Sequence, residues 1–149
     1  MNYDLILGII NIVLISTTPL VFAGIGELVT EKSGVLNLGL EGLMLVGAVS
    51  GFISLVITGN YFYSFILSIL SGVILSSIFA FFVLRLLTNQ IATGLALTIF
   101  GIGLSAMLGK KFGGTPINGL SPYYLILFSF ILVFLINYIL YKTKAGLII

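Results

Sequence analysis

Five polar residues stand out because the sequence around them is strongly apolar: Asn37, Glu41, Asn89, Gln90 and Thr93. A carboxylate can bind a polar solute, and side-chain amides donate and accept hydrogen bonds at once, which suits sugar hydroxyls and the edges of nucleobases. Ionisable groups at membrane depth are expensive and tend to be functional. Glu41 is the clearest case, since residues 33–40 and 42–84 carry no charge. We treat these five residues as candidates for contact with a polar solute.

Glu41 allows two interpretations. In the first, its side chain faces an internal cavity and contacts a polar substrate or a partner helix. In the second, a helix begins shortly before it and the carboxylate lies in the first turn at the interface, where the helix dipole stabilises it. We favour the second on the residues alone. On a continuous helix, Asn37 would share a face with Glu41 because it lies four residues earlier.

The segment Ser33–Gly42 is unusual in that glycines and an asparagine interrupt an apolar run, S-G-V-L-N-L-G-L-E-G. Transporters break helices where substrate binds, because the freed backbone groups then serve as ligands. A simple cytoplasmic hairpin with glycine turns explains the same residues equally well. The second polar cluster has a structural explanation for Asn89, which suits a helix N-cap. That explanation accounts less well for Gln90 and Thr93.

The elements that carry these residues are long apolar segments. Hydrophobic residues make up 60% of the 149-residue chain and charged residues only 7%, against about 25% charged in soluble domains. A membrane-spanning helix needs about 20 mostly apolar residues. We therefore predict an all-α, polytopic helical membrane protein with a broken-helix segment near residues 33–42. Five spans are expected, at about 5–22, 38–57, 62–84, 91–108 and 123–141.

Two further sequence features concern how these spans pack. Thr17-Thr18-Pro19 should loosen or kink the first span, since proline removes a helical hydrogen bond. Small residues recur within the next three spans and should let helix backbones approach closely in lipid. They include Gly42, Gly47, Gly51, Ser64, Ser68, Ser71, Gly94 and Gly101.

The residues that are missing exclude several kinds of chemistry. The chain has no His and no Cys, so it can hold neither a Cys/His zinc site nor a Ser-His-Asp triad. It also lacks a Walker A phosphate loop and a metal-ligand cluster. We expect no catalytic residues, no metal and no cofactor in this chain; any ATP would be bound by another chain. A soluble enzyme and a nucleic-acid binder are excluded by composition.

The orientation follows from the lysines and arginines in the short loops. With the N-terminus outside, four basic residues face the cytoplasm and two face out. In the opposite orientation, two basic residues face the cytoplasm and four face out. The first group is Lys32, Arg85, Lys142 and Lys144, and the second is Lys110 and Lys111. We expect a multi-pass protein with its N-terminus outside and its C-terminus in the cytoplasm.

Three stretches resemble bacterial ABC transporter permeases for nucleosides and simple sugars, in the branched-chain amino acid and ribose permease superfamily. The first and most specific is Thr17–Ala48, which contains T-E-K-S-G-V-L-N-L-G-L-E-G-L. The second is Thr88–Lys110, beginning T-N-Q-I-A-T-G, and the third is Y-K-T-K-A-G-L, Tyr141–Leu147. The three occur in the family's order.

The resemblance implies a bacterial inner-membrane subunit that works with other chains. Such permeases pair as two membrane subunits on two cytoplasmic ATPases, and an extracytoplasmic substrate-binding protein delivers the solute. Carried onto this chain, the N-L-G-L-E-G pattern points to Asn37 and Glu41 near the pathway. The N-Q-I-A-T-G pattern points to Asn89, Gln90 and Thr93.

The resemblance covers the N-terminal half of such permeases, which run to about twice this length. We expect a truncated or split permease subunit, unable by itself to couple ATP hydrolysis to transport. The alternative is a small stand-alone membrane scaffold or assembly protein derived from a permease half. A proton-coupled carrier using Glu41 is a third hypothesis, which the resemblance disfavours.

Overall fold

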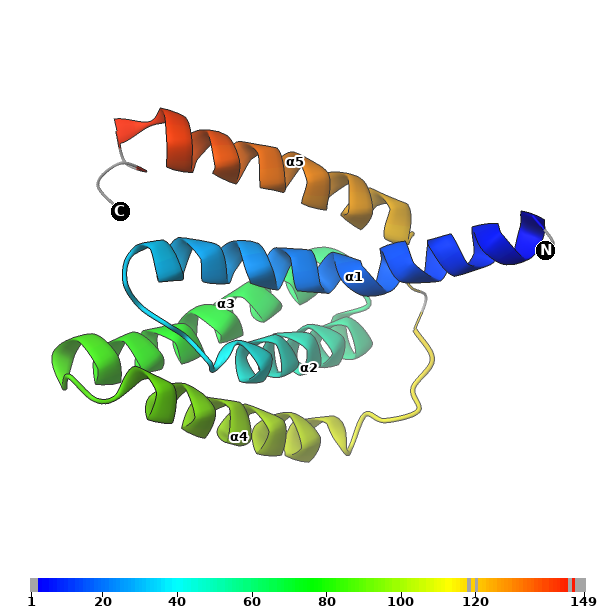
Figure 1. Cartoon of the computed structure of the whole chain (residues 1–149). Coiled ribbons are helices and arrows are strands. Elements are labelled where there is room, and N and C mark those ends of the chain that lie inside the picture. The colour runs from blue at the N-terminus through cyan, green and yellow to red at the C-terminus, as the bar shows by residue number, and fades with distance from the viewer. Residues whose placement is uncertain (1–2, 118, 120, 145, 147–149) are drawn as a thin grey trace. The chain divides into compact units, whose positions relative to one another are not determined.

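The fold consists of helices joined by loops, of which the longest connects α4 to α5 (Figure 1). The computed structural model describes residues 3–117, 119, 121–144 and 146. Its helices are α1 (Tyr3–Lys32), α2 (Leu40–Thr58), α3 (Tyr61–Ala80), α4 (Gln90–Gly109) and α5 (Pro122–Lys142), and a π-helical turn η1 (Phe81–Arg85) extends α3. The described residues contain no strand. Five helices are long and apolar enough to cross a membrane, which confirms the predicted fold class.

The chain divides into two compact units. One contains α1 and α5; the other contains α2, α3, η1 and α4. In the first unit, Lys32 and Tyr141 lie together near the C-terminal ends of α1 and α5, so these two helices run parallel. Parallel first and fifth helices agree with a chain that crosses the membrane an odd number of times.

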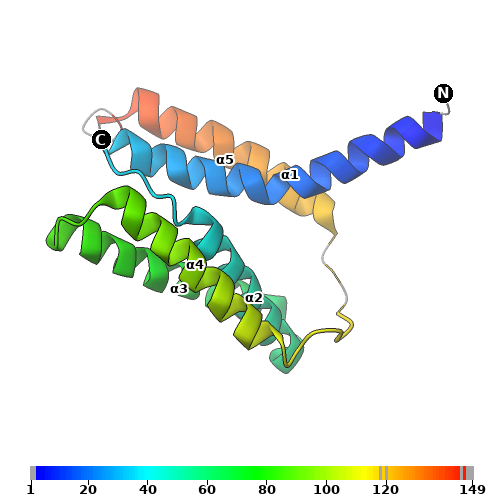
Figure 2. The same cartoon turned by 60° about the horizontal axis from the view of Figure 1, so that its bottom comes forward.

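Helix α1 is longer than the expected span, which ended at Phe22. It continues to Lys32, because Pro19 is accommodated and the next strong stop is Gly34, whose φ of 82° is left-handed. Figure 2 shows that α1 bends part-way along. Pro19 cannot donate a helical hydrogen bond, and Thr17 and Thr18 return their hydroxyls to carbonyls four residues back, at 2.8 and 2.7 Å. The predicted kink is thus present, within the helix rather than at its end.

When η1 is counted with α3, the other helices begin and end within two residues of the expected spans. The turn between α2 and α3 shows how single residues determine where a helix ends and the next one begins. Gly59 takes the left-handed conformation that ends α2, with φ 65°, and Asn60 caps α3 by accepting a hydrogen bond from the Phe62 N–H at 2.9 Å. At the far end of α3, η1 leads into Leu87, whose φ of 53° reverses the chain toward α4.

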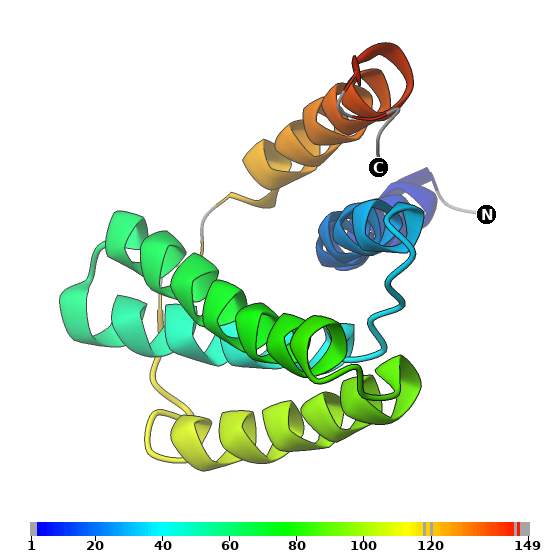
Figure 3. The same ribbon diagram turned by 90° about the vertical axis from the view of Figure 1, so that its left-hand side faces the viewer.

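In the second unit, α2 packs between α3 and α4 (Figure 3). Serines of α3 bond to backbone carbonyls of α2: Ser64 to Gly51 at 2.7 Å and Ser68 to Gly47 at 2.8 Å. Without side chains at these glycines, the two backbones come close enough for the bonds to form. The interpretation of the small residues as packing devices is confirmed here. A core formed by Val46, Leu75, Phe79, Val83 and Leu97 holds the three helices together.

Candidate functional site

The two polar clusters of the sequence lie next to each other in the second unit. The non-helical residues before α2 pack along the N-terminal half of α4, and two side chains of α4 hold their backbone. Gln90 Oε1 accepts a hydrogen bond from the Leu36 N–H at 2.8 Å. Thr98 Oγ1 donates to the Leu38 carbonyl at 2.8 Å. These bonds satisfy backbone groups that have no helical partner, as membrane-embedded irregular backbone requires.

Glycines make this close approach possible. A Cβ on Gly94 would lie 2.8 Å from the Leu38 nitrogen, and one on Gly42 would lie 2.6 Å from the Leu97 carbonyl oxygen. A Cβ on Gly101 would lie 2.5 Å from the Gly42 Cα. Helices α2 and α4 therefore touch backbone to backbone, and the position of α2's first turns depends on these glycines.

Asn37 shapes the segment rather than facing an open space. It is 6% exposed, and its Oδ1 accepts a hydrogen bond from the Gly39 N–H at 2.9 Å. This turn redirects the chain just before α2 begins at Leu40. A continuous helix through Asn37 and Glu41 is thus absent, and the two residues do not share a helix face.

Asn89, Gln90 and Thr93 form the start of α4. Asn89 is the N-cap, and its Oδ1 accepts from the Ile91 and Ala92 N–H groups at 3.0 and 3.2 Å, which confirms the structural interpretation of this residue. The Thr93 hydroxyl lies 2.8 Å from the Asn89 carbonyl oxygen and 2.9 Å from the Thr88 hydroxyl. Gln90 instead bonds through its Oε1 to the segment before α2, which explains why a capping role did not account for this residue.

Replacing Asn89 with alanine should lower the free energy of unfolding by about 1 kcal/mol, because two N–H groups at the start of α4 lose their acceptor. Asn89→Asp keeps the acceptor and should retain most of the stability. A denaturant titration of the purified chain in detergent micelles measures both variants. Equal losses for alanine and aspartate would contradict the capping role.

Glu41 lies in the first turn of α2, as the favoured interpretation of the sequence expected. Its side chain is exposed, and no hydrogen bond or ion pair to it is found among the described residues. The helix dipole stabilises a carboxylate at this position. Of the five candidates, Glu41 is the one whose side chain makes no hydrogen bond within the part of the chain that the structure describes.

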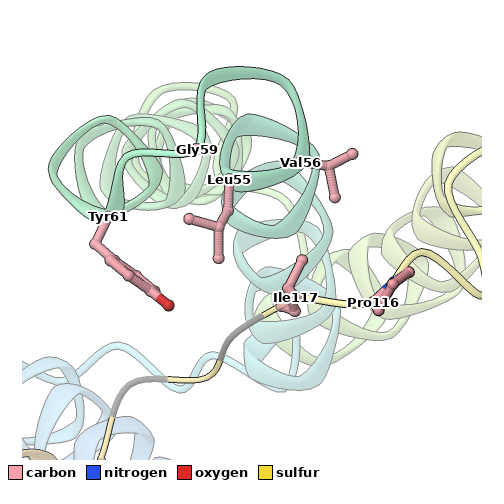
Figure 4. A pocket seen from close by; sticks show the side chains of 6 residues that line it. All are labelled: Leu55, Val56, Gly59, Tyr61, Pro116 and Ile117. Carbon is pink, nitrogen blue, oxygen red and sulfur yellow. The ribbon is translucent and has the colours of Figure 1, made fainter.

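A separate pocket of about 340 Å³ lies at the other end of α2 (Figure 4). Its walls come from the turn between α2 and α3 and from the loop after α4, and its lining residues are Leu55, Val56, Gly59, Tyr61, Pro116 and Ile117. It contains none of the five candidates and no charged side chain. No cluster of His, Cys, Asp or Glu able to hold a metal is found in the described ranges.

Thr98 was not among the residues predicted from the sequence, although it holds the segment before α2. Its partner, Leu38, is 60 residues away along the chain. The only local signal was its spacing of four residues from Gly94, which places both on one face of α4.

Comparison with known proteins decides the family. The family described as the permease component of the branched-chain amino acid transport system matches residues 9–149. The chain belongs to this permease family. Members of this family are described as the permease component of a transport system, and membership supports a multi-pass membrane protein together with the five apolar helices.

Relatives within the permease family include sugar and nucleoside transporters. A putative glucose ABC transporter permease protein of Haloferax volcanii is 42% identical over 112 residues, which cover 75% of this chain and 34% of the relative. A nucleoside ABC transporter permease protein of Lactococcus lactis is 51% identical over 37 residues, 25% of this chain and 12% of the relative. A guanosine ABC transporter permease protein of Bacillus subtilis is 45% identical over 40 residues, 27% of this chain and 12% of the relative.

The matches to these permeases cover only part of each relative, about a third of the glucose permease. No solved structure matches the chain.

Proposed function

We propose that this chain forms part of the membrane pathway of an ATP-driven importer for nucleosides or simple sugars. The observation that carries the proposal is the family match over residues 9–149, together with relatives named as glucose, nucleoside and guanosine permeases. In this proposal the chain lies in a cell membrane beside a second permease subunit. Separate cytoplasmic ATPase subunits hydrolyse ATP, and an extracytoplasmic binding protein delivers the solute.

Within this proposal, the segment packed on α4 borders the pathway. Glu41 is the group that meets the solute, because its carboxylate is exposed and unpaired among the described residues. Asn37 and Gln90 act on the pathway by holding the segment before α2, since Asn37 Oδ1 accepts from the Gly39 N–H and Gln90 Oε1 accepts from the Leu36 N–H. Asn89 and Thr93 shape the start of α4, to which this segment is bonded. A hydroxyl-rich solute suits a free carboxylate, which accepts hydrogen bonds at both oxygens.

Uptake measurements test the proposal in cells that carry the native transport system. Deleting the gene should abolish uptake of at least one solute in a panel of labelled nucleosides and sugars, and the wild-type gene should restore it. Glu41→Gln should lower that uptake about tenfold at unchanged protein level, since hydrogen bonds to charged groups contribute about 1.5–3 kcal/mol. Glu31→Gln, an exposed carboxylate in the last turn of α1, is the matched control and should transport normally.

Unchanged uptake of every solute after deletion would contradict an importer role. It would favour a stand-alone membrane protein instead. A normal rate for Glu41→Gln beside a strong deletion effect would leave the importer intact and remove Glu41 from the pathway.

The proposed orientation has the N-terminus outside and the C-terminus in the cytoplasm. The chain contains no cysteine, so single cysteines can be introduced without background. A membrane-impermeant maleimide added to intact cells should label Lys110→Cys, which follows α4, and leave Arg85→Cys, at the end of η1, unlabelled until the cells are opened. The reverse pattern would invert the topology.

A further inference from the structure

Helices α1 and α5 enclose a continuous groove on the first unit. Two neighbouring hollows, of about 420 and 150 Å³, share Val21 and Val133 and so form one trough along the helix pair. On α1 the trough is lined from Leu14 to Leu28. At 1.5 Å per residue this is about 21 Å, longer than the roughly 15 Å of one leaflet's hydrocarbon core.

The wall of the groove is apolar in effect, although some of its residues carry hydroxyls. Thr18 donates to the Leu14 carbonyl at 2.7 Å, and Ser129 donates to the Ile126 carbonyl at 2.7 Å. Because both hydroxyls already donate a hydrogen bond within their own helices, a ligand in the groove does not need to accept a hydrogen bond from them. The trough therefore offers a hydrocarbon-like surface of the length of an acyl chain.

One end of the groove is cationic. Tyr141 lines the groove at this end, and the Lys32 ammonium lies 4.5 Å from the centre of its ring. Lys142 and Lys144 follow Tyr141 in the chain, and both are exposed. Glu27 and Glu31 are the carboxylates in the last two turns of α1, so the three lysines exceed the carboxylates at this end by one charge.

Between the cationic end and the apolar trough lies Asn137. It lines the groove one helical turn before Tyr141, about 6 Å deeper along α5. Within the described part of the chain its amide has no hydrogen-bond partner. Its side chain is exposed, so its amide N–H groups can donate to a ligand in the groove.

We propose that this groove binds one anionic glycerophospholipid. An acyl chain lies along the α1–α5 trough, an ester carbonyl accepts from Asn137, and the phosphate lies at Lys32 and Lys142. Basic pockets beside membrane helices bind anionic headgroups in this way. The proposal goes beyond the importer function and does not rest on it, because it needs only a chain embedded in lipid.

Native mass spectrometry of the purified chain tests the site, with equal amounts of phosphatidylglycerol and phosphatidylcholine of matched acyl chains added in detergent. The wild type should retain one phosphatidylglycerol in clear preference to phosphatidylcholine. Lys32→Gln should reduce that preference about fivefold, since a lysine near an anionic headgroup contributes about 1 kcal/mol. Lys111→Gln, an exposed lysine in the loop after α4, should not change it.

Two glycines of α1 provide a test that distinguishes filling of the groove from a general effect of substitution on the helix. Gly24 lines the groove, whereas Gly26 does not, and a Cβ on either would meet no atom within 4 Å. Gly24→Leu should fill the trough and abolish lipid retention. Gly26→Leu adds the same side chain to the same helix and should retain the lipid as the wild type does.

Three results would overturn the proposal. The first is equal retention of the two lipids by the wild type, and the second is full retention by Gly24→Leu. The third is a second protein chain, rather than a lipid, bound to the wild type and displaced by Gly24→Leu.

Discussion

Gly101→Val is expected to destabilise the second unit by about 3 kcal/mol, at the upper end of the cost of overpacking a core. The added Cβ would lie 2.5 Å from the Gly42 Cα and 2.6 Å from the Gly42 carbonyl oxygen. Both are backbone atoms, so no side chain can rotate away and α2 must separate from α4. The measurement is the midpoint of thermal unfolding in detergent, followed by circular dichroism, with size-exclusion chromatography as a check on folding.

Gly103→Val is the matched control for this experiment. It makes the same substitution in the same helix, two residues away, where a Cβ would meet no atom within 4 Å. The control should unfold within a few degrees of the wild type. If both variants were destabilised equally, the cause would be the loss of helix flexibility or β-branching, and the backbone contact between α2 and α4 would be refuted.

Gln90→Leu is expected to lower the free energy of unfolding by about 2 kcal/mol, because it leaves the Leu36 N–H without its acceptor. The side chain keeps its approximate volume, so the loss reports the hydrogen bond rather than a cavity. The segment before α2 should also become mobile. Hydrogen exchange at the Leu36 amide should therefore accelerate more than exchange at amides of the α2–α3 interface.

Gln90→Glu tests whether the acceptor or the exact residue matters. A carboxylate oxygen can still accept from the Leu36 N–H, so protection of that amide should be largely restored. Slow exchange at Leu36 in the leucine variant would show that another group holds this segment. In that case the proposed positioning role of Gln90 around Glu41 would fail as well.

Much of the architecture could be predicted from the sequence because it depends on local properties. Long uncharged runs are sufficient to define membrane-crossing helices, since lipid offers no partner for an exposed backbone group. Gly59 and Asn60 marked the end of α2 and the start of α3, and both do so through contacts within four residues. The cap at Asn89 was predictable for the same reason.

The C-terminal end of α1 was harder to predict. The first span was expected to end at about Phe22, shortly after Thr17-Thr18-Pro19, yet the helix absorbs Pro19 as a bend and stops only at Lys32. Propensity is a weak guide where apolar surroundings leave the backbone no alternative to its own hydrogen bonds.

The site shows what tertiary structure alone decides. The residue types of Glu41 and Gln90 marked them as unusual, but nothing local showed that Gln90 bonds to Leu36, 54 residues earlier, or Thr98 to Leu38. The sequence also did not show which glycines contact the backbone of a neighbouring helix, since Gly101 and Gly103 differ only in the face of α4 that they occupy. The sequence determined that this is an α-helical membrane chain with polar residues at a few sites. Only the packing of α2 on α4 determined that most of those polar groups bond to the protein itself and that the carboxylate of Glu41 stays open, because such contacts join residues far apart in the chain.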